Sequence, residues 1–290
     1  MKKIGEGGSA IVYTYELAGK HAALKTFRNP LSRRKTEKIV KKLVELKHEN
    51  LVRFLGYSLQ PSCIALEYCE LNFDGEIVHN ASQLLDIWND EENFNLHNRF
   101  NIIKQATAGL EALHRSGIIH RDFKPSNLLV TGVLSNILIK VSDFDDFYGI
   151  KNTTMATQTM TSNRLVGCTL AYTAEEICLQ YANAPSFSAD IFSWAMTCYE
   201  IFAGVPSPWV NVLPILNDVL LVNALSEKKR PPISDLKHRY CGAEKTVDLL
   251  SKLICQCWDS EPTKRLTVQQ VNILAILLFL LLTLGFLIPQ

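Results

Sequence analysis

Two short stretches of the sequence hold residue types that chemistry on phosphate groups requires. Residues 120–127 read His-Arg-Asp-Phe-Lys-Pro-Ser-Asn, and residues 143–145 read Asp-Phe-Asp. Carboxylate and amide oxygens are ligands that Mg²⁺ accepts, and a lysine neutralises phosphate charge as a compact cation. Phosphoryl transfer asks a protein mainly to position two oxygens in line and to neutralise charge, so these residue types suit that reaction.

A glycine-rich segment near the N-terminus could add a phosphate-binding surface. Residues 5–10 read Gly-Glu-Gly-Gly-Ser-Ala and lie before a β-prone run. Where side chains are absent, backbone N–H groups can close over phosphates. Taken alone, a glycine-rich turn is usually only a turn. Here Lys25 lies on the next β-prone run, so the glycine-rich segment is accompanied by a lysine that could neutralise phosphate charge.

The elements that must position these residues change in type along the chain. β-prone runs flank a turn at Gly19, which predicts a hairpin, and residues 32–46 have the spacing of an amphipathic helix. Later segments continue the order of strands first and helices afterwards: β-prone at 51–57 and 63–69, and helical at 81–85 and 100–114. This order predicts an α+β fold, with a small sheet lobe joined to a larger helical lobe.

With these motifs in this order, residues 4–271 resemble a eukaryotic protein kinase, nearest the tyrosine-kinase-like branch. The resemblance implies a bilobal fold with an antiparallel-sheet N-lobe in residues 1–69, whose first strand is shortened, and a helical C-lobe in residues 70–270. It implies ATP and Mg²⁺ as cofactors and proteins as substrates. Lys124 and Thr169 resemble the serine/threonine type, so serine and threonine hydroxyls are the expected acceptors.

The resemblance also assigns roles to individual residues. Asp122 is expected to accept the proton of the attacking hydroxyl, and Lys124 to support the γ-phosphate. Asn127 and Asp143 are expected to hold the metal, and Lys25 to reach the α- and β-phosphates. The residues expected around the nucleotide match the glycine-rich loop, the adenine pocket and the hinge: Ile4, Gly5, Gly7, Ala10, Val12, Ala23, Lys25, Glu67, Cys69 and Leu129.

Other matches imply support and control rather than chemistry. Asp190 is expected to brace the catalytic loop from a central helix, and Glu176 to pair with Arg265. Residues 151–162 are rich in threonine and lack an apolar period, which predicts a surface loop. Because a guanidinium takes phosphate bidentately, Arg121 suggests control by a phosphate on this loop, with Thr161 or Ser162 favoured.

Several positions depart from the family pattern. Counting from the motif around His48, the helix position whose glutamate should pair with Lys25 is Ile39. Either a shifted register presents Glu37, or the pair is missing. Asp145 stands where the metal-binding motif has glycine, and Glu175 replaces a proline. The change at Glu175 is expected only to reduce local rigidity, whereas Ile39 and Asp145 leave a pseudokinase open as the alternative, a module that binds nucleotide or a partner without transferring phosphate.

Composition excludes other classes of function. The 290 residues carry 30 Lys and Arg against 29 Asp and Glu, so a nucleic-acid binder is not expected despite the basic helix. The eight cysteines are scattered behind an N-terminus without an apolar secretory segment, which predicts reduced thiols and a cytoplasmic location. No cysteine and histidine spacing matches a zinc site.

The C-terminal tail, residues 271–290, begins with an apolar run. Residues 271–288 contain no charged residue, and 18 residues meet the lower limit for spanning a bilayer. The sequence therefore predicts an apolar C-terminal helix that anchors the chain in an internal membrane, with the kinase domain facing the cytosol. The alternative is that residues 267–280 form the last helix of the helical lobe.

Overall fold

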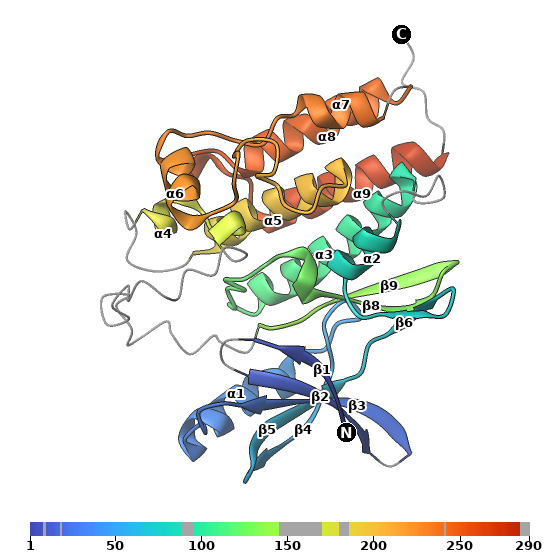
Figure 1. Ribbon diagram of the computed structural model, residues 1–290, viewed down its shortest axis with the longest axis vertical. Coiled ribbons are helices and arrows are strands. Elements are labelled where there is room, and N and C mark those ends of the chain that lie inside the picture. The colour runs from blue at the N-terminus through green and yellow to red at the C-terminus, as the bar shows by residue number, and fades with distance from the viewer. Residues whose placement is uncertain are drawn as a thin grey trace.

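The computed structural model describes residues 1–7, 10–17, 19–88, 95–144, 170–179, 186–240 and 242–284, which form two lobes (Figure 1). The smaller lobe holds an antiparallel sheet in the order β1-β2-β3-β5-β4, with α1 packed against β4. Its elements are β1 (Lys2–Glu6), β2 (Ala10–Leu17), β3 (Lys20–Phe27), α1 (Arg33–Glu45), β4 (Phe54–Leu59) and β5 (Ser62–Glu67). The predicted hairpin is confirmed as β2 and β3.

Local sequence explains why α1 forms where the spacing predicts it. The Ser32 side chain accepts a hydrogen bond from the backbone N–H of Lys35, which satisfies a donor that the first helical turn leaves free. Thr36, Ile39 and Leu43 are buried at positions three and four apart, so one stripe of the helix packs on the sheet. The rest of the helix carries most of its lysines and arginines towards solvent.

The larger lobe is mainly helical and also holds two separate two-stranded sheets. Its elements are β6 (Leu71–Phe73), β7 (Glu76–Val78), α2 (Ala81–Trp88), α3 (Leu96–Arg115), β8 (Leu128–Val133), β9 (Asn136–Val141), α4 (Glu175–Cys178), α5 (Phe187–Ala203), α6 (Asp218–Ser226), α7 (Ser234–Arg239), α8 (Glu244–Cys257) and α9 (Val268–Leu284). Short 3₁₀ helices lie at Pro125–Asn127, Leu170–Tyr172 and Pro262–Lys264. The predicted sheet lobe followed by a mainly helical lobe is confirmed, but the strict order of strands before helices is wrong, because β8 and β9 follow α3.

Helix α5 is the centre of the larger lobe. Every residue from Ala189 to Ala203 is buried, which is typical of a helix surrounded by other elements. Ser186 caps its first turn, and Gly204 ends it with a φ of 64°, a conformation that costs glycine little. Because α5 is fixed on all sides, a polar group on it can hold a neighbouring loop in a defined position.

The prediction of a membrane anchor at the C-terminus is wrong for the part that the structure describes. The segment forms α9, which begins at Val268 and lies beside α3 (Figure 1). One side of the helix, including Val271, Ala275 and Leu278, is buried against the lobe. Among the described residues, no helix combines the length and the apolar character needed to cross a membrane. The sequence did not predict this arrangement, because the segment is apolar on all sides. Its pattern therefore has no hydrophobic period that would mark one side of the helix as buried.

Candidate functional site

The pleat of the sheet places the predicted nucleotide-binding residues of β2 and β3 on one face. Val12 lies opposite Lys25 in the β2–β3 register, and Ala23 lies opposite Leu66 of β5. Residues directly opposite share a face, as do residues two apart along a strand. Val12, Ala23 and Lys25 therefore share one face, and Ala10 joins them two positions before Val12.

The glycine-rich turn lies at the edge of this face. Gly5 of β1 lies opposite Val12, and the backbone N–H of Gly7 donates a 2.9 Å hydrogen bond to the carbonyl of Ala10. A Cβ at Gly5 would lie 3.7 Å from Val12, in ordinary contact, so the glycine is not required by packing. Ile4 is half-buried on β1. The described part of this segment leads into β2, which pairs with the strand that carries Lys25.

Lys25 forms an ion pair that joins the two lobes. Its Nζ contacts Oδ1 of Asp143, which lies 118 positions later and directly after β9. Burial alone would raise the pKa of the Asp143 carboxyl, but the ammonium of Lys25, with His120 and Lys124, holds it below its ordinary value. Asp143 is therefore ionised at neutral pH, as a metal ligand must be.

A second cluster surrounds Asp122 at the edge of the helical lobe. Its Oδ2 lies 2.8 Å from Nζ of Lys124 and accepts a 3.0 Å hydrogen bond from Nδ2 of Asn127. The Asn127 amide also donates to the Asp122 backbone carbonyl at 2.7 Å. Within the described residues, Oδ1 of Asp122 is buried and accepts no hydrogen bond. One carboxylate oxygen is thus fixed, and the other remains able to accept a proton.

Asp190 of α5 holds the loop that carries this cluster, which confirms the predicted brace. Its carboxylate accepts from the backbone N–H groups of His120 and Arg121, at 2.7 and 2.8 Å, and from Nε2 of His114 at 2.8 Å. Arg121 and Asp143 have φ values of 74° and 62°, a strained region for residues other than glycine. Such strain persists where surrounding contacts enforce it and is concentrated at functional sites.

The segment predicted to pair with a nucleotide base connects β5 to the helical lobe. Glu67 ends β5, and one of its carboxylate oxygens lies 3.2 Å from Nζ of Lys140. His79 donates from Nδ1 to the backbone carbonyl of Cys69 at 3.1 Å. Burial raises the pKa of the Cys69 thiol to about 12, so this cysteine is not a nucleophile. Leu129 lies on β8 opposite Lys140 and is half-buried.

Helix α1 does not present Glu37 to Lys25. The Glu37 carboxylate instead accepts a 2.8 Å hydrogen bond from Nε of Arg33, one turn earlier on the exposed side of α1. Ile39, the position expected to hold a glutamate, is 2% exposed and belongs to the core. Of the two possibilities that the sequence left open, the shifted register is therefore wrong. The Lys25 ammonium pairs instead with Asp143 of the helical lobe.

Two adjacent glutamates make buried ion pairs below the site. Glu176 binds Arg265 through two hydrogen bonds of 2.7 and 2.8 Å, which confirms the predicted pair. Glu175, which was expected only to loosen the chain in place of a proline, lies 2.8 Å from Arg230. The two guanidinium groups both lie 5.1 Å from the ring of Phe192. The sequence did not predict Arg230, because it belongs to none of the motifs that the resemblance supplied, unlike Arg265.

Some predicted residues fall outside the described ranges. These are Asp145, Thr169 and the loop of residues 151–162. Within the described ranges, no three side chains of His, Cys, Asp and Glu converge as a metal-binding group.

Comparison with known proteins shows which proteins this chain resembles. The protein kinase domain family matches residues 1–274. A probable serine/threonine-protein kinase of Dictyostelium discoideum is 31% identical over 278 residues, covering 93% of this chain and 19% of the relative. A putative serine/threonine-protein kinase/receptor of Acanthamoeba polyphaga mimivirus is 30% identical over 285 residues, covering 93% of this chain and 15% of the relative.

A plant protein is also similar in sequence to this chain, over fewer residues. A G-type lectin S-receptor-like serine/threonine-protein kinase of Arabidopsis thaliana is 34% identical over 213 residues, covering 70% of this chain and 24% of the relative. The chain spans less than a quarter of the length of each of these three relatives. The likeness therefore concerns one region of much longer proteins.

Proposed function

The chain belongs to the protein kinase family, of the serine/threonine type, and from this premise we propose that it transfers the γ-phosphate of ATP to serine and threonine hydroxyls of proteins. The observation that carries the proposal is the cluster of Asp122, Lys124 and Asn127, held in place by Asp190. A proton acceptor, a cation and an amide within hydrogen-bonding distance are the groups that this reaction needs.

The residues present fit a magnesium–nucleotide complex. The Asn127 amide nitrogen is occupied by Asp122, so its orientation is fixed and its oxygen is left for a cation. Asp143 supplies an ionised carboxylate. Two hard oxygen ligands suit Mg²⁺, which would neutralise charge on the transferred group when bound. Lys25, paired with Asp143 in this structure, is placed to exchange that partner for phosphate oxygens.

The transfer step then divides between two groups of this chain. Oδ1 of Asp122 is proposed to accept the hydroxyl proton of the acceptor, because Oδ2 already receives hydrogen bonds from two neighbours. Lys124 is proposed to stabilise charge on the transferred group while remaining within reach of Asp122. Asp190 is a positioning residue, since it contacts the loop backbone and not the reacting atoms.

A pseudokinase is the second candidate, and one specific observation favours it. Burial of Ile39 and the pairing of Glu37 with Arg33 leave α1 without a carboxylate aimed at Lys25. In the family this contact belongs to the active arrangement. For either candidate we propose a cytosolic location. The cysteines in the described ranges are free thiols, which suits a reducing compartment.

Transfer of phosphate from labelled ATP to a generic protein acceptor separates the two candidates. We expect turnover by the parent chain and a loss of at least about 100-fold in Asp122→Asn, because the proton acceptor is removed. Nucleotide binding, measured separately by fluorescence titration, should change little in this variant. A parent that binds ATP with Mg²⁺ but transfers no phosphate at all would support the pseudokinase and overturn the proposal.

A further inference from the structure

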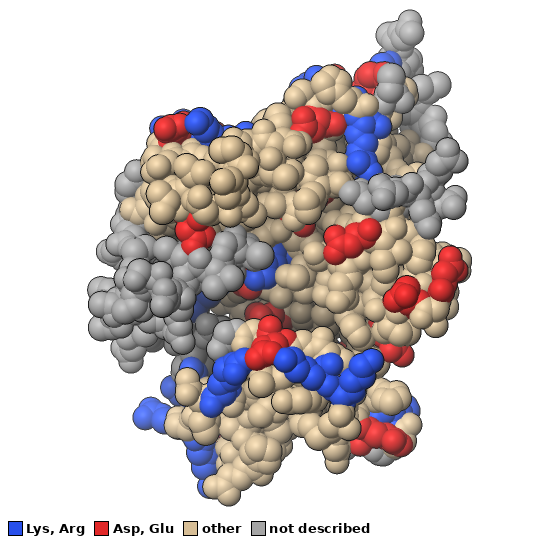
Figure 2. All heavy atoms as spheres, viewed as in Figure 1, with Lys and Arg blue, Asp and Glu red and all other residues tan. Residues whose placement is uncertain are grey.

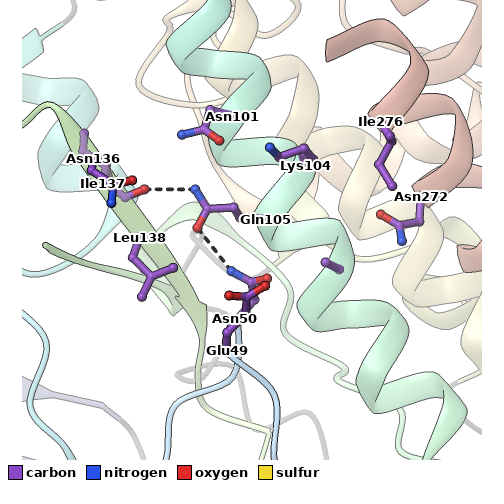
Figure 3. Close-up of a pocket in the computed structure, with 11 residues that line it drawn as sticks. Glu49, Asn50, Asn101, Lys104, Gln105, Asn136, Ile137, Leu138, Asn272 and Ile276 are labelled. Carbon is purple, nitrogen blue, oxygen red and sulfur yellow. Dashed lines mark hydrogen bonds between the residues drawn. The ribbon is translucent and has the colours of Figure 1, made fainter. Parts of the chain in front are cut away.

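A cavity beside α3 lies apart from the proposed nucleotide site. It has a volume of about 360 Å³ and is bounded by α3, β9, α9 and the loop that joins α1 to β4 (Figure 3). None of the residues expected around ATP lines it. Most of the side chains that do so are polar: Glu49, Asn101, Lys104, Gln105, Asn136 and Asn272. A lining of this kind favours a polar ligand.

Two of the amides in the lining already have partners within the chain. Nε2 of Gln105 donates to the carbonyl of Ile137 at 2.9 Å, and Oε1 of Gln105 accepts from the backbone N–H of Ile139 at 2.9 Å. Nδ2 of Asn50 donates to Oε1 of Gln105 at 3.2 Å and to the carbonyl of Ile139 at 2.9 Å. These contacts hold α3, β9 and the loop after α1 together. They fix the shape of the cavity without any ligand.

Two opposite charges line the same cavity without pairing. The ammonium of Lys104 lies 3.8 Å from the centroid of the Phe279 ring and forms no ion pair with a described residue. Burial lowers the pKa of Lys104 below its ordinary value, and the carboxylate of Glu49 opposes this shift from a distance. The Glu49 carboxylate likewise forms no ion pair within the described part of the chain. Figure 3 shows these two side chains at separate places around the cavity.

Asn272 of α9 adds an acceptor that lacks a donor. Its Nδ2 donates to a carboxylate oxygen of Glu111, which fixes the orientation of the amide. Its Oδ1 is buried and accepts no hydrogen bond from the residues that the structure describes. Figure 3 shows the Asn272 side chain pointing from α9 towards α3. A buried acceptor without a donor costs free energy, so a ligand that brings a donor to this end of the cavity would be favoured.

We propose that this cavity binds a small zwitterion, an amino acid or a dipeptide, with its carboxylate at Lys104 and its ammonium at Glu49. A molecule that carries both charges pairs each of them with an opposite charge of the lining. A phosphate ester with two negative charges would meet Lys104 but would be repelled by Glu49. A neutral molecule would leave both side chains unpaired. The ammonium also supplies the kind of donor that Asn272 lacks.

The rest of the lining indicates the size and the side chain of the ligand. Ile137 and Leu138 of β9 and Ile276 of α9 contribute apolar surface. Figure 3 shows Leu138 and Ile276 on opposite sides of α3 in this view. The volume is near the lower end of the roughly 300–1,000 Å³ that is usual for ligand pockets. The cavity therefore suits one or two amino-acid units with an aliphatic side chain, such as leucine or alanyl-leucine.

Titration of the full chain with leucine and with alanyl-leucine, followed by NMR of the ligand, tests the proposal. The two molecules hold their charges at different separations, so the tighter one shows which spacing the cavity accepts. Because the cavity is partly open to solvent, we expect a Kd of roughly 0.1–1 mM for the tighter ligand. Absence of binding by both ligands up to about 20 mM would overturn the proposal.

Removing one charge at a time identifies which end of the ligand meets which side chain. The N-acetyl derivative of the tighter ligand lacks the ammonium, and its C-terminal amide lacks the carboxylate. Each should bind the parent chain at least about tenfold more weakly than the zwitterion. Lys104→Met should weaken the zwitterion by the same factor without weakening the amide further. Glu49→Gln should do so without weakening the N-acetyl derivative further.

Lys41→Met is the matched control, because Lys41 is exposed on α1 and lies outside the cavity. It should bind the zwitterion as the parent does, and equal thermal unfolding shows that every variant is folded. Unchanged affinity in both Lys104→Met and Glu49→Gln would overturn the proposal. Excess ATP with Mg²⁺ should leave the ligand bound, because the two sites share no residue. Displacement of the ligand by ATP would place it in the nucleotide site and would also overturn the proposal.

Discussion

The two lobes differ in the sign of their excess charge and in how their charged side chains are paired. Residues 1–69 hold 13 Lys and Arg against 6 Asp and Glu, whereas residues 70–290 hold 17 against 23. In Figure 2 the Lys and Arg side chains gather over the lobe that contains the sheet. In the helical lobe, the buried acids Asp190, Glu175 and Glu176 each meet a named donor. In the sheet lobe, the helix beside Lys25 offers no carboxylate to it.

Because of this difference, the helical lobe can position Asp122 before any ligand binds. The catalytic loop is fixed by Asp190 within the helical lobe alone. Lys25 belongs to the sheet lobe, and its ammonium pairs with Asp143 of the helical lobe. The position of Lys25 therefore depends on how the lobes meet, whereas the position of Asp122 does not. The following predictions test whether the positions of Lys25 and Asp122 depend on different contacts.

The largest effect on stability is expected from breaking the buried pair of Arg265 and Glu176. Arg265→Met leaves a buried carboxylate without its guanidinium, which should lower the free energy of unfolding by about 3–5 kcal/mol. Arg33→Met is the matched control, because its pair with Glu37 is exposed and should contribute less than about 0.5 kcal/mol. Urea denaturation of both variants measures the difference. Equal losses would contradict the contrast between the lobes.

A smaller loss of stability, with a specific loss of activity, is expected for Asp190→Asn. The amide keeps one acceptor oxygen but loses the charge that holds two backbone N–H groups and His114, at a cost of about 1.5–3 kcal/mol. Because this brace acts on the loop of Asp122 and not on Lys25, kcat should fall while KM for ATP stays within about twofold. A variant that loses stability but keeps kcat would remove the positioning role.

An effect seen only as a dependence on pH is expected at Glu200 of α5. Burial raises the pKa of this carboxyl to about 8; the hydroxyl of Tyr172 opposes the shift, and the charge of Asp86 adds to it. Between the ordinary pKa of 4.5 and about 8, the folded chain keeps a proton that the unfolded chain releases. The free energy of unfolding therefore falls as pH rises through this window, by at most about 1.4 kcal/mol per pH unit.

Glu200→Gln removes this dependence, because an amide is neutral at every pH. Urea denaturation of parent and variant near the two ends of the window should give curves that diverge as pH rises, with the parent losing more. Parallel behaviour of the two chains would show that Glu200 does not titrate in this range.

The sequence predicted those parts of the fold and site that depend on local pattern or on a known motif. Alternation and turn residues gave the hairpin of β2 and β3, and helical spacing gave α1. The motif order gave Asp190 as a brace and Arg265 as the partner of Glu176. Each of these features is encoded by neighbouring residues or by a fixed place in a family pattern.

Features that arise from tertiary contact were missed. The pairing of Glu175 with Arg230 joins residues 55 positions apart without any pattern between them. Spacing alone could not decide between Glu37 and Ile39, because both lie on the same helix and only packing shows which one is buried. The packing of the apolar C-terminal segment against α3 was not predicted, for a third reason. A bilayer and a protein surface both accept an apolar helix, and hydropathy does not distinguish them.

The most direct test of the central claim compares Lys25→Met with Glu37→Gln in the phosphate-transfer assay. In the proposed function, Lys25 reaches the nucleotide phosphates; in the structure it pairs with Asp143, whereas Glu37 pairs with Arg33. Lys25→Met should therefore lose at least about 100-fold in turnover, while Glu37→Gln should stay within about twofold of the parent. If Glu37→Gln loses as much turnover as Lys25→Met, the helix supplies the carboxylate after all, and the account of the site is contradicted.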